Sequence, residues 1–206
     1  MALTKVRGSG LGTLGDGTAN DNSIIFDGNA QDFHIGLDDS ADSLTIGLGS
    51  TLGTTSHMVI DANGHVTKPL QPAFMVHPSS DQDNLSTGTT TVAFGTERYD
   101  VNGDFASNTF TAPVTGKYLF TVSLYLEQIP IDSNYIECFI DTSNRDYYHS
   151  FDPRGFDQTP ILMSASWSIV ADMDASDTCL VKITQSAGST TLDVNTASHW
   201  SGCLLA

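Results

Sequence analysis

The residues best suited to recognition chemistry cluster in one short stretch, 144–156. This stretch holds five aromatic side chains, histidine included, and two of the six basic residues that follow Arg7. Arginine, tyrosine and histidine offer a large contact area with few rotatable bonds, and tyrosine and histidine can stack on sugar rings. We therefore expect at least one of four residues to contact a binding partner: Arg145, Tyr148, His149 and Arg154. The alternative is that the tyrosines pack within a strand or at a subunit interface.

Acidic turns are a second candidate for chemistry, because calcium prefers carboxylate oxygens as ligands. Asp38, Asp39 and Asp42 lie within five residues of one another, and residues 172–177 hold three more aspartates. Residues 100–104 superficially resemble a calcium loop, but their glycine comes one position early and the distal glutamate is missing. Calcium at Asp38, Asp39 and Asp42 is the alternative to ordinary solvated turns, and no other cofactor is expected.

The familiar catalytic motifs do not appear in a usable form. Residues 10–15 fit the GxGxxG pattern, but no strand precedes them and no helical pattern follows, so a dinucleotide site is not indicated. The six histidines show no HxxxH or HExxH spacing, and no GxSxG nucleophile motif occurs. The sequence therefore predicts a protein that is not an enzyme.

Charge and composition exclude several kinds of partner. The formal net charge is −16 and the pI is about 4.3, so nucleic acid and anionic membranes are unfavourable partners. The 24 acidic residues include only three Glu, hence 24 − 3 = 21 Asp, which favour turns over helix interiors. Three cysteines without a CxxC pair, and an amino terminus without an apolar signal segment, predict a chain folded in a reducing cytoplasm. No apolar run is long enough to insert into a membrane.

The chain divides by composition near Pro69 and Pro72. Residues 8–67 contain eight Asp and no Lys or Arg. Residues 1–22 lack apolar periodicity, which predicts an extended anchoring arm. Residues 23–70 carry short β-prone runs separated by turn clusters, and the Asn-Gly pair at 63–64 predicts positive φ angles in a hairpin. We expect a β-hairpin stem that is too small to bury a core alone and is stabilised by copies of itself.

Residues 71–206 alternate apolar and polar side chains in the way that half-buried strands do. The clearest run is 118–126, and further runs occur at 135–140, 164–170, 179–184 and 199–205. Clusters of Asp, Ser, Asn and Gly separate them. This pattern predicts an all-β fold, an antiparallel sandwich or jelly roll.

A set of residues in this second part has a characteristic spacing. Its members are Phe94, Asp100, Phe105, Phe110, Gly116, Tyr118, Phe120, Trp200 and Gly202. With residues 72–74 as a first strand, the set resembles the signature of the globular head of complement component q, a jelly roll related to tumour necrosis factor. The resemblance implies a complement-like jelly-roll knob at 71–206 that forms a homotrimer. We expect the signature residues to supply core and turns rather than ligand contacts.

The first part of the chain resembles bacteriophage fibre proteins through one unit, Ile-Asp-Ala-Asn-Gly-His-Val at 60–66. The two resemblances together imply a non-enzymatic trimeric virion protein, made in the host bacterial cytoplasm. As a short tail fibre, it would attach to other virion proteins through its arm and to a glycan or protein on the host surface through its knob. Two alternatives stay open: a capsid decoration protein, either head fibre or cement, and a free trimeric lectin-like binding module.

Overall fold

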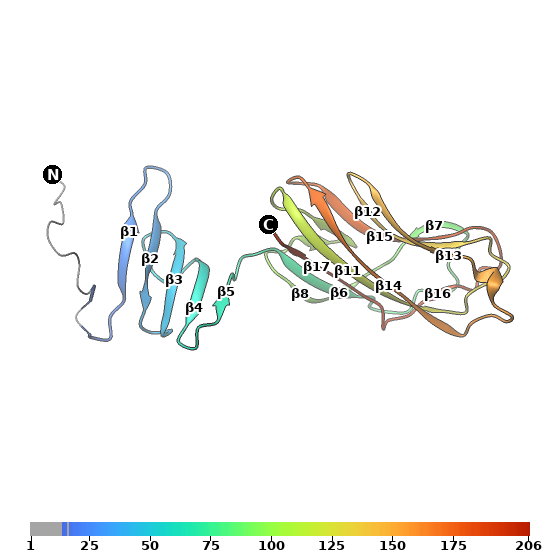
Figure 1. Cartoon of the computed structure of the whole chain (residues 1–206), viewed down its shortest axis with the longest axis horizontal. Coiled ribbons are helices and arrows are strands. Elements are labelled where there is room, and N and C mark those ends of the chain that lie inside the picture. The colour runs from blue at the N-terminus through green and yellow to red at the C-terminus, as the bar shows by residue number, and fades with distance from the viewer. Residues whose placement is uncertain (1–13, 16) are drawn as a thin grey trace. The chain divides into compact units, whose positions relative to one another are not determined.

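The computed structural model describes residues 14, 15 and 17–206, and the chain divides into two compact units between Gln71 and Pro72 (Figure 1). The arm predicted at 1–22, with its glycine-rich motif, lies largely outside the described residues. Within them, every regular element is a β-strand except one short 3-10 helix, η1 (Pro153–Gly155). No helix in this part of the chain has the length and apolar character needed to span a membrane.

Five short antiparallel strands form a meander in the first unit. They are β1 (Asn22–Phe26), β2 (Phe33–Asp38), β3 (Ser43–Leu48), β4 (Ser56–Asp61) and β5 (Val66–Thr67). Each strand pairs with the next one along the chain, so the order in the sheet is β1-β2-β3-β4-β5 (Figure 1). The strands expected in the stem therefore form, and the turns between them are rich in Asp, Asn and Gly, as turn preferences require.

The hairpin between β4 and β5 differs in one detail from expectation. The Asn-Gly pair predicts two positive φ angles, but only Gly64 has one, at 86°. The Gly64 amide donates to the carbonyl of Asp61 at 2.9 Å, and the Asp61 carboxylate accepts from the amides of Asn63 and His65, both at 2.9 Å. Because the carboxylate holds the turn, a single left-handed glycine is sufficient.

The second unit is a sandwich of two six-stranded antiparallel sheets (Figure 1). One sheet has a groove on its outer face, described below, and we call it the groove sheet. It contains β7 (Gly88–Thr91), β9 (Phe105–Ala106), β10 (Thr109–Thr111), β12 (Ile136–Thr142), β13 (Asp146–Phe151) and β15 (Thr178–Gln185). The other, the hydroxyl sheet, contains β6 (Ala73–His77), β8 (Thr96–Asp100), β11 (Gly116–Glu127), β14 (Leu162–Met173), β16 (Asp193–Val194) and β17 (His199–Leu204). The predicted all-β jelly-roll sandwich is confirmed.

Alternation along β11 shows how the core of this sandwich is built. Its even-numbered residues from Tyr118 to Leu126 are buried, and the residues between them face outward. Phe74 of β6 lies in an aromatic cluster, with its ring centroid 4.9 Å from those of both Phe110 and Trp200. All aromatic members of the signature set are buried: Phe94, Phe105, Phe110, Tyr118, Phe120 and Trp200.

Other signature residues make a close approach and a turn. A Cβ added at Gly202 would lie 2.6 Å from ring atoms of Phe74 and of Phe120, so the space admits only hydrogen. The Asp100 carboxylate accepts from the amides of Asp104, at 3.1 Å, and of the following residue, at 3.0 Å. These bonds close the turn that leads into β9.

Candidate ligand-binding groove

The four residues predicted to contact a partner come from one segment but point in different directions. Successive side chains of a strand alternate between its two faces. On β13, an edge strand of the groove sheet, Tyr148 therefore lies on the outer face, while its neighbour His149 faces inward and stacks on Trp167. Arg145 precedes the strand and Arg154 follows it. Of the four, only Tyr148 lines the groove described next.

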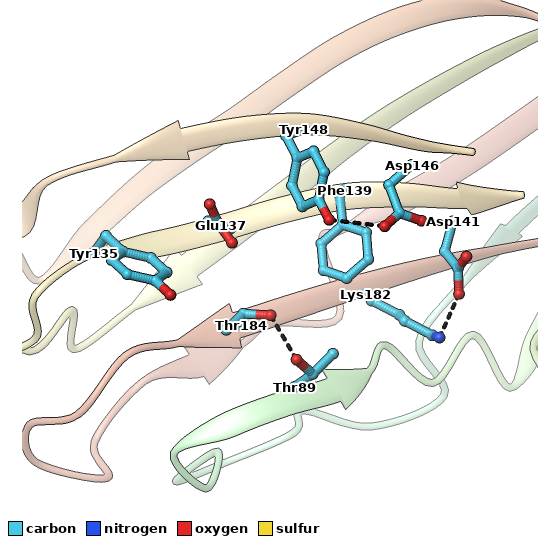
Figure 2. A pocket seen from close by; sticks show the side chains of 9 residues that line it. All are labelled: Thr89, Tyr135, Glu137, Phe139, Asp141, Asp146, Tyr148, Lys182 and Thr184. Carbon is cyan, nitrogen blue, oxygen red and sulfur yellow. Dashed lines mark hydrogen bonds and ion pairs between the residues drawn. The ribbon is translucent and has the colours of Figure 1, made fainter.

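Tyr148 borders an open groove of about 490 Å³ on the outer face of the groove sheet (Figure 2). The other lining residues are Thr89, Tyr135, Glu137, Phe139, Asp141, Asp146, Lys182 and Thr184. Strand register sets them in rows, since Tyr148 is paired with Phe139 and Phe139 with Lys182. In another row Glu137 lies opposite Thr184. The groove is thus built mainly on paired strands, which hold side chains more rigidly than loops do.

Two aromatic rings form its apolar surface. The centroids of Phe139 and Tyr148 are 5.0 Å apart, and Phe139 is buried although it faces outward. The Tyr148 residue remains 56% exposed. Its hydroxyl donates to the Asp146 carboxylate at 2.7 Å, and this hydrogen bond, followed by desolvation, raises the pKa of Tyr148 above its ordinary value. The phenol therefore stays protonated at neutral pH, with its ring oriented by Asp146.

Carboxylates dominate the polar lining. Glu137, Asp141 and Asp146 face one ammonium group, that of Lys182, so the formal charge of the groove is 1 − 3 = −2. Lys182 forms an ion pair with Asp141, and both side chains are less than one third exposed. The single cation is therefore already partnered, and the groove presents mainly hydrogen-bond acceptors beside an aromatic surface.

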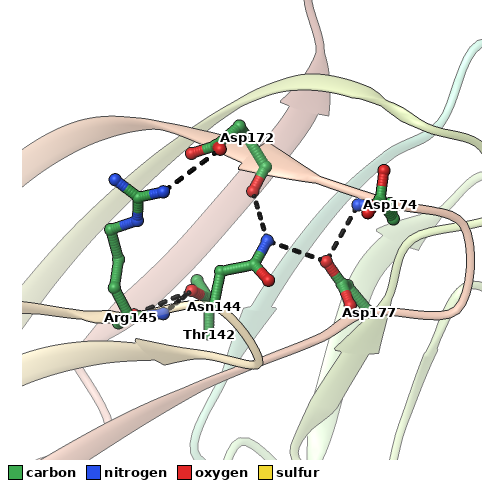
Figure 3. Close-up of polar contacts among 6 residues, drawn as sticks. All are labelled: Thr142, Asn144, Arg145, Asp172, Asp174 and Asp177. Atoms are coloured by element: carbon green, nitrogen blue, oxygen red, sulfur yellow. Dashed lines mark hydrogen bonds and ion pairs between the residues drawn. The ribbon is translucent and has the colours of Figure 1, made fainter.

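Arg145 belongs to a separate polar cluster (Figure 3). Its guanidinium donates to the Asp172 carboxylate at 3.2 Å. Asn144 donates to the Asp172 carbonyl and to the Asp177 carboxylate, both at 2.9 Å. These contacts join the turn between β12 and β13 to the end of β14 and to the turn that precedes β15, so the Arg145 side chain already has a partner within the chain.

Arg154 and His149 are also engaged by their neighbours. Arg154 contacts the Asp152 carboxylate through two nitrogens, at 2.9 and 2.8 Å, and this hydrogen bonding lowers the pKa of Asp152. The His149 ring stacks on Trp167 with centroids 5.5 Å apart and an interplanar angle of 6°. A partner contact by Arg145, His149 or Arg154 stays a prediction, and the structure does not bring these three together with Tyr148.

The acidic turn proposed for calcium is explained by its own hydrogen bonds. The Asp38 carboxylate accepts from the Ser40 hydroxyl at 2.8 Å and from the Ala41 amide at 3.1 Å, which closes the turn between β2 and β3. The described residues contain no group of three or more His, Cys, Asp or Glu side chains that could hold a metal ion. Asp38, Asp39 and Asp42 are therefore not gathered into a cation site, and the calcium alternative has no support.

Sequence reasoning missed most of the groove, although β12 carried a signal. Glu137, Phe139 and Asp141 alternate with inward residues, which places a large aromatic side chain between two carboxylates on the solvent side of one strand. Such an arrangement is costly in water unless a neighbour covers the ring, as Tyr148 does here. The contribution of Lys182 depends on the pairing of β12 with β15, which the sequence does not reveal.

Comparison with known proteins agrees with this architecture. The C1q domain family matches residues 73–205. The chain belongs to the C1q domain family. Among solved structures, the globular domain of zebrafish complement 1qA is similar, with 19% identity, a TM-score of 0.50, and coverage of 66% of this chain and 98% of that one. Murine APRIL at pH 8.0 gives 11% identity, a TM-score of 0.48, and coverage of 66% and 99%. No curated protein sequence matches.

Membership of this family settles the general class of the second unit. C1q domains are binding modules without enzymatic activity, and they are generally homotrimeric. The family match begins at residue 73, so it leaves the first unit unassigned. None of these comparisons supports the resemblance of that unit to bacteriophage fibre proteins.

Proposed function

We propose that this C1q-family protein is a homotrimeric receptor-binding protein whose groove holds an uncharged glycan. The observation that carries the proposal is the pairing of an exposed aromatic ring with carboxylates in one concave site. Sugar rings stack on tyrosine, and their hydroxyl groups donate hydrogen bonds to carboxylates. The groove thus offers a saccharide both an aromatic ring on which to stack and acceptors for its hydroxyl groups.

The charge of the groove narrows the class of glycan. Its three carboxylates would repel a phosphate or carboxylate on the ligand, and its one ammonium group is paired with Asp141. Neutral hexoses satisfy the acceptors without bringing in a like charge. We therefore expect the groove to bind anionic glycans more weakly than neutral ones.

The binding test compares two tyrosines of similar exposure. Tyr148 is 56% exposed and lines the groove, whereas Tyr99 is 49% exposed and lies on β8 of the other sheet. On a panel of immobilised neutral and anionic oligosaccharides, we expect neutral glycans to bind. Tyr148→Ala should weaken that binding about fivefold or more, given about 1–3 kcal/mol for a stacked ring, and Tyr99→Ala should not. Preference for anionic glycans, or equal effects of the two variants, would refute the assignment.

The hydroxyl sheet supports the homotrimer. At the centre of the three neighbouring strands β14, β11 and β17, outward serine and threonine side chains gather, and they include the hydrogen-bonded pairs Thr121–Ser168 at 3.0 Å and Ser123–Ser166 at 2.8 Å. Between Lys117 at one end and Glu127 at the other, β11 carries no charged residue. A face whose centre carries no charge, in a chain of net charge −16, suits a subunit interface, since the centre of such an interface is depleted of charge. Light scattering at micromolar concentration tests this: a trimer is expected, and a monomer contradicts it.

We also propose that the protein is a virion component of a bacteriophage, a short fibre that attaches through its amino-terminal arm and binds the host surface with its knob. The fibre-like unit at 60–66, which forms the β4–β5 hairpin, supports this placement. Antibody-labelled electron microscopy of intact particles is the test. A few labelled copies at the tail are expected, whereas copies distributed over the shell would identify a capsid decoration protein. Unlabelled particles would refute the virion role.

A further inference from the structure

The sheet of the first unit has one apolar face and one polar face. Cross-strand partners lie on the same face of a sheet. The register pairs Ile24 with Ile35, Ile35 with Ile46, and Ile46 with Met58, so one face is apolar across four strands. The apolar residues of this face, which we call the apolar stripe, are Ile24, Phe26, Phe33, Ile35, Leu37, Leu44, Ile46, Leu48, Met58, Ile60 and Val66.

The polar face, not the apolar one, is covered by the chain itself. Ser43 and Thr45 are only 4% and 2% exposed. The loop at 49–55 lies over this face: the His34 ring nitrogen contacts the Gly49 carbonyl at 2.9 Å, and a Cβ at Gly53 would lie 2.6 Å from an Asp38 oxygen. Among the described residues of this unit, the 49–55 loop thus covers the polar face, and the apolar stripe is left open.

The apolar stripe is large enough to form a stable interface. Seven of its members are between 39% and 60% exposed: Ile24, Phe26, Phe33, Leu37, Leu44, Ile46 and Val66. Seven large side chains that are each about half exposed leave on the order of several hundred Å² open, which is comparable with the roughly 300–600 Å² of the largest patch on a typical monomer. Such patches often mark interaction sites. One partner in a stable interface contributes about 800 Å², so the stripe approaches the size of a subunit interface.

Charge indicates what kind of partner fits. No stripe residue is charged, and residues 8–67 carry eight Asp without a Lys or Arg. An anionic lipid surface would be repelled by the aspartates around the stripe. An identical sheet offers an equally apolar face, and its acidic turns can remain in water when the two stripes meet.

The connection between the first unit and the C1q domain is short, so a homotrimer of C1q domains would hold three copies of the first sheet at a high local concentration. Only residues 68–72 separate β5 from β6, and five extended residues span at most about 18 Å. In a homotrimer, three copies of this sheet would be tethered close together, with an effective concentration on the order of millimolar. Association of the sheets then needs little further loss of translational freedom.

We propose that the apolar stripe packs against the same stripe of two other copies, so that three sheets enclose one shared apolar core. The assembly rests on the homotrimer of the proposed function, and it extends that trimer into the first unit. It also accounts for the polar residues under the 49–55 loop, because each sheet then has both faces covered.

Adjacent residues of β1 provide a matched test in the full chain. Ile24 and Ile25 are 49% and 44% exposed, but Ile24 lies on the stripe and Ile25 on the other face. Because both are half exposed, an aspartate at either position is tolerable in an unpartnered sheet. In the assembly, Ile24→Asp would place three carboxylates in the shared core. Ile46→Asp makes the same change at the centre of the stripe.

Hydrogen exchange of the β2 and β3 amides is the readout, with light scattering on the same samples. We expect Ile24→Asp and Ile46→Asp to speed exchange about tenfold or more, and Ile25→Asp to change it less than about twofold. If all samples are trimers with equal exchange, the stripe assembly is wrong while the trimer stands. If the wild type is a monomer, both proposals fail. Wild-type binding to phosphatidylcholine vesicles, lost in Ile24→Asp, would instead identify a lipid surface as the occupant.

Discussion

The substitution Gly202→Ala probes the centre of the C1q domain. An alanine Cβ at this position would lie 2.6 Å from Cδ1 of Phe120, 2.6 Å from Cε1 of Phe74 and 2.8 Å from Cε1 of Phe120. Both rings are buried, and Phe74 is held between Phe110 and Trp200 at centroid distances of 4.9 Å. Gly202 does not have a positive φ angle, so the backbone accepts alanine and the whole penalty is steric.

The size of the penalty follows from this geometry. Overpacking a core with one extra methyl typically costs about 1–3 kcal/mol. We expect the upper end, about 3 kcal/mol, because two rings must move and both are fully buried in a close-packed core. With an m-value of about 2 kcal/mol/M for a domain of this size, the urea midpoint should fall by about 1.5 M.

Urea unfolding of the full chain, followed by tryptophan fluorescence at one fixed protomer concentration, provides the measurement. The concentration is held constant because the apparent stability of an oligomer depends on it. Two other glycines calibrate the result. At Gly116 the added Cβ meets the flexible end of Leu204 and the terminal Ala206, so a loss of about 1 kcal/mol is expected. At Gly155 it meets nothing within 4 Å, so no loss is expected. A Gly202→Ala midpoint equal to that of Gly155→Ala would refute the steric argument.

Three further outcomes are expected. Burial raises the pKa of Cys138 to about 12 and that of the buried Cys179 thiol well above its usual range, so neither should react with a disulfide reagent at pH 8 until urea unfolds the domain. Desolvation, with repulsion from a neighbouring aspartate, raises the pKa of Asp104, so the folded state loses stability as pH rises from 3.8 through the raised value. Asp104→Asn should therefore stabilise the protein at pH 7 and have little effect below pH 3.8, as thermal melts can check; equal effects at both pH values would contradict the assignment. Lys182→Met leaves Asp141 without its ion partner and should cost about 1 kcal/mol, whereas Lys117→Met on the other sheet should cost less; equal urea midpoints for the two variants would argue against a stabilising ion pair.

The sequence indicates only part of the groove, and the tertiary structure was needed to locate the rest. The composition of the segment predicts a contact role for Tyr148 and His149 equally, but His149 faces the opposite side of the strand from Tyr148. Composition shows which residue types a segment contains, whereas the alternation of side chains along the strand decides which of them lie on the face of the groove. The position of Arg145 was equally hidden, because its partner Asp172 comes from β14, another part of the chain.

The alternation of apolar side chains along single strands was sufficient to predict the β-sandwich, because burial of every second residue is a local property that sequence displays directly. Signature residues such as Phe110 and Trp200 identified the family for the same reason: their spacing within the chain carries the pattern. Only the tertiary structure decided which strands are neighbours, and so placed Phe139 and Lys182 in one groove. It also decided that the apolar side of the first sheet is the open one, because the covering loop at 49–55 binds His34 on the opposite face. Contacts between residues distant in the chain arise from folding as a whole, and no local pattern encodes them.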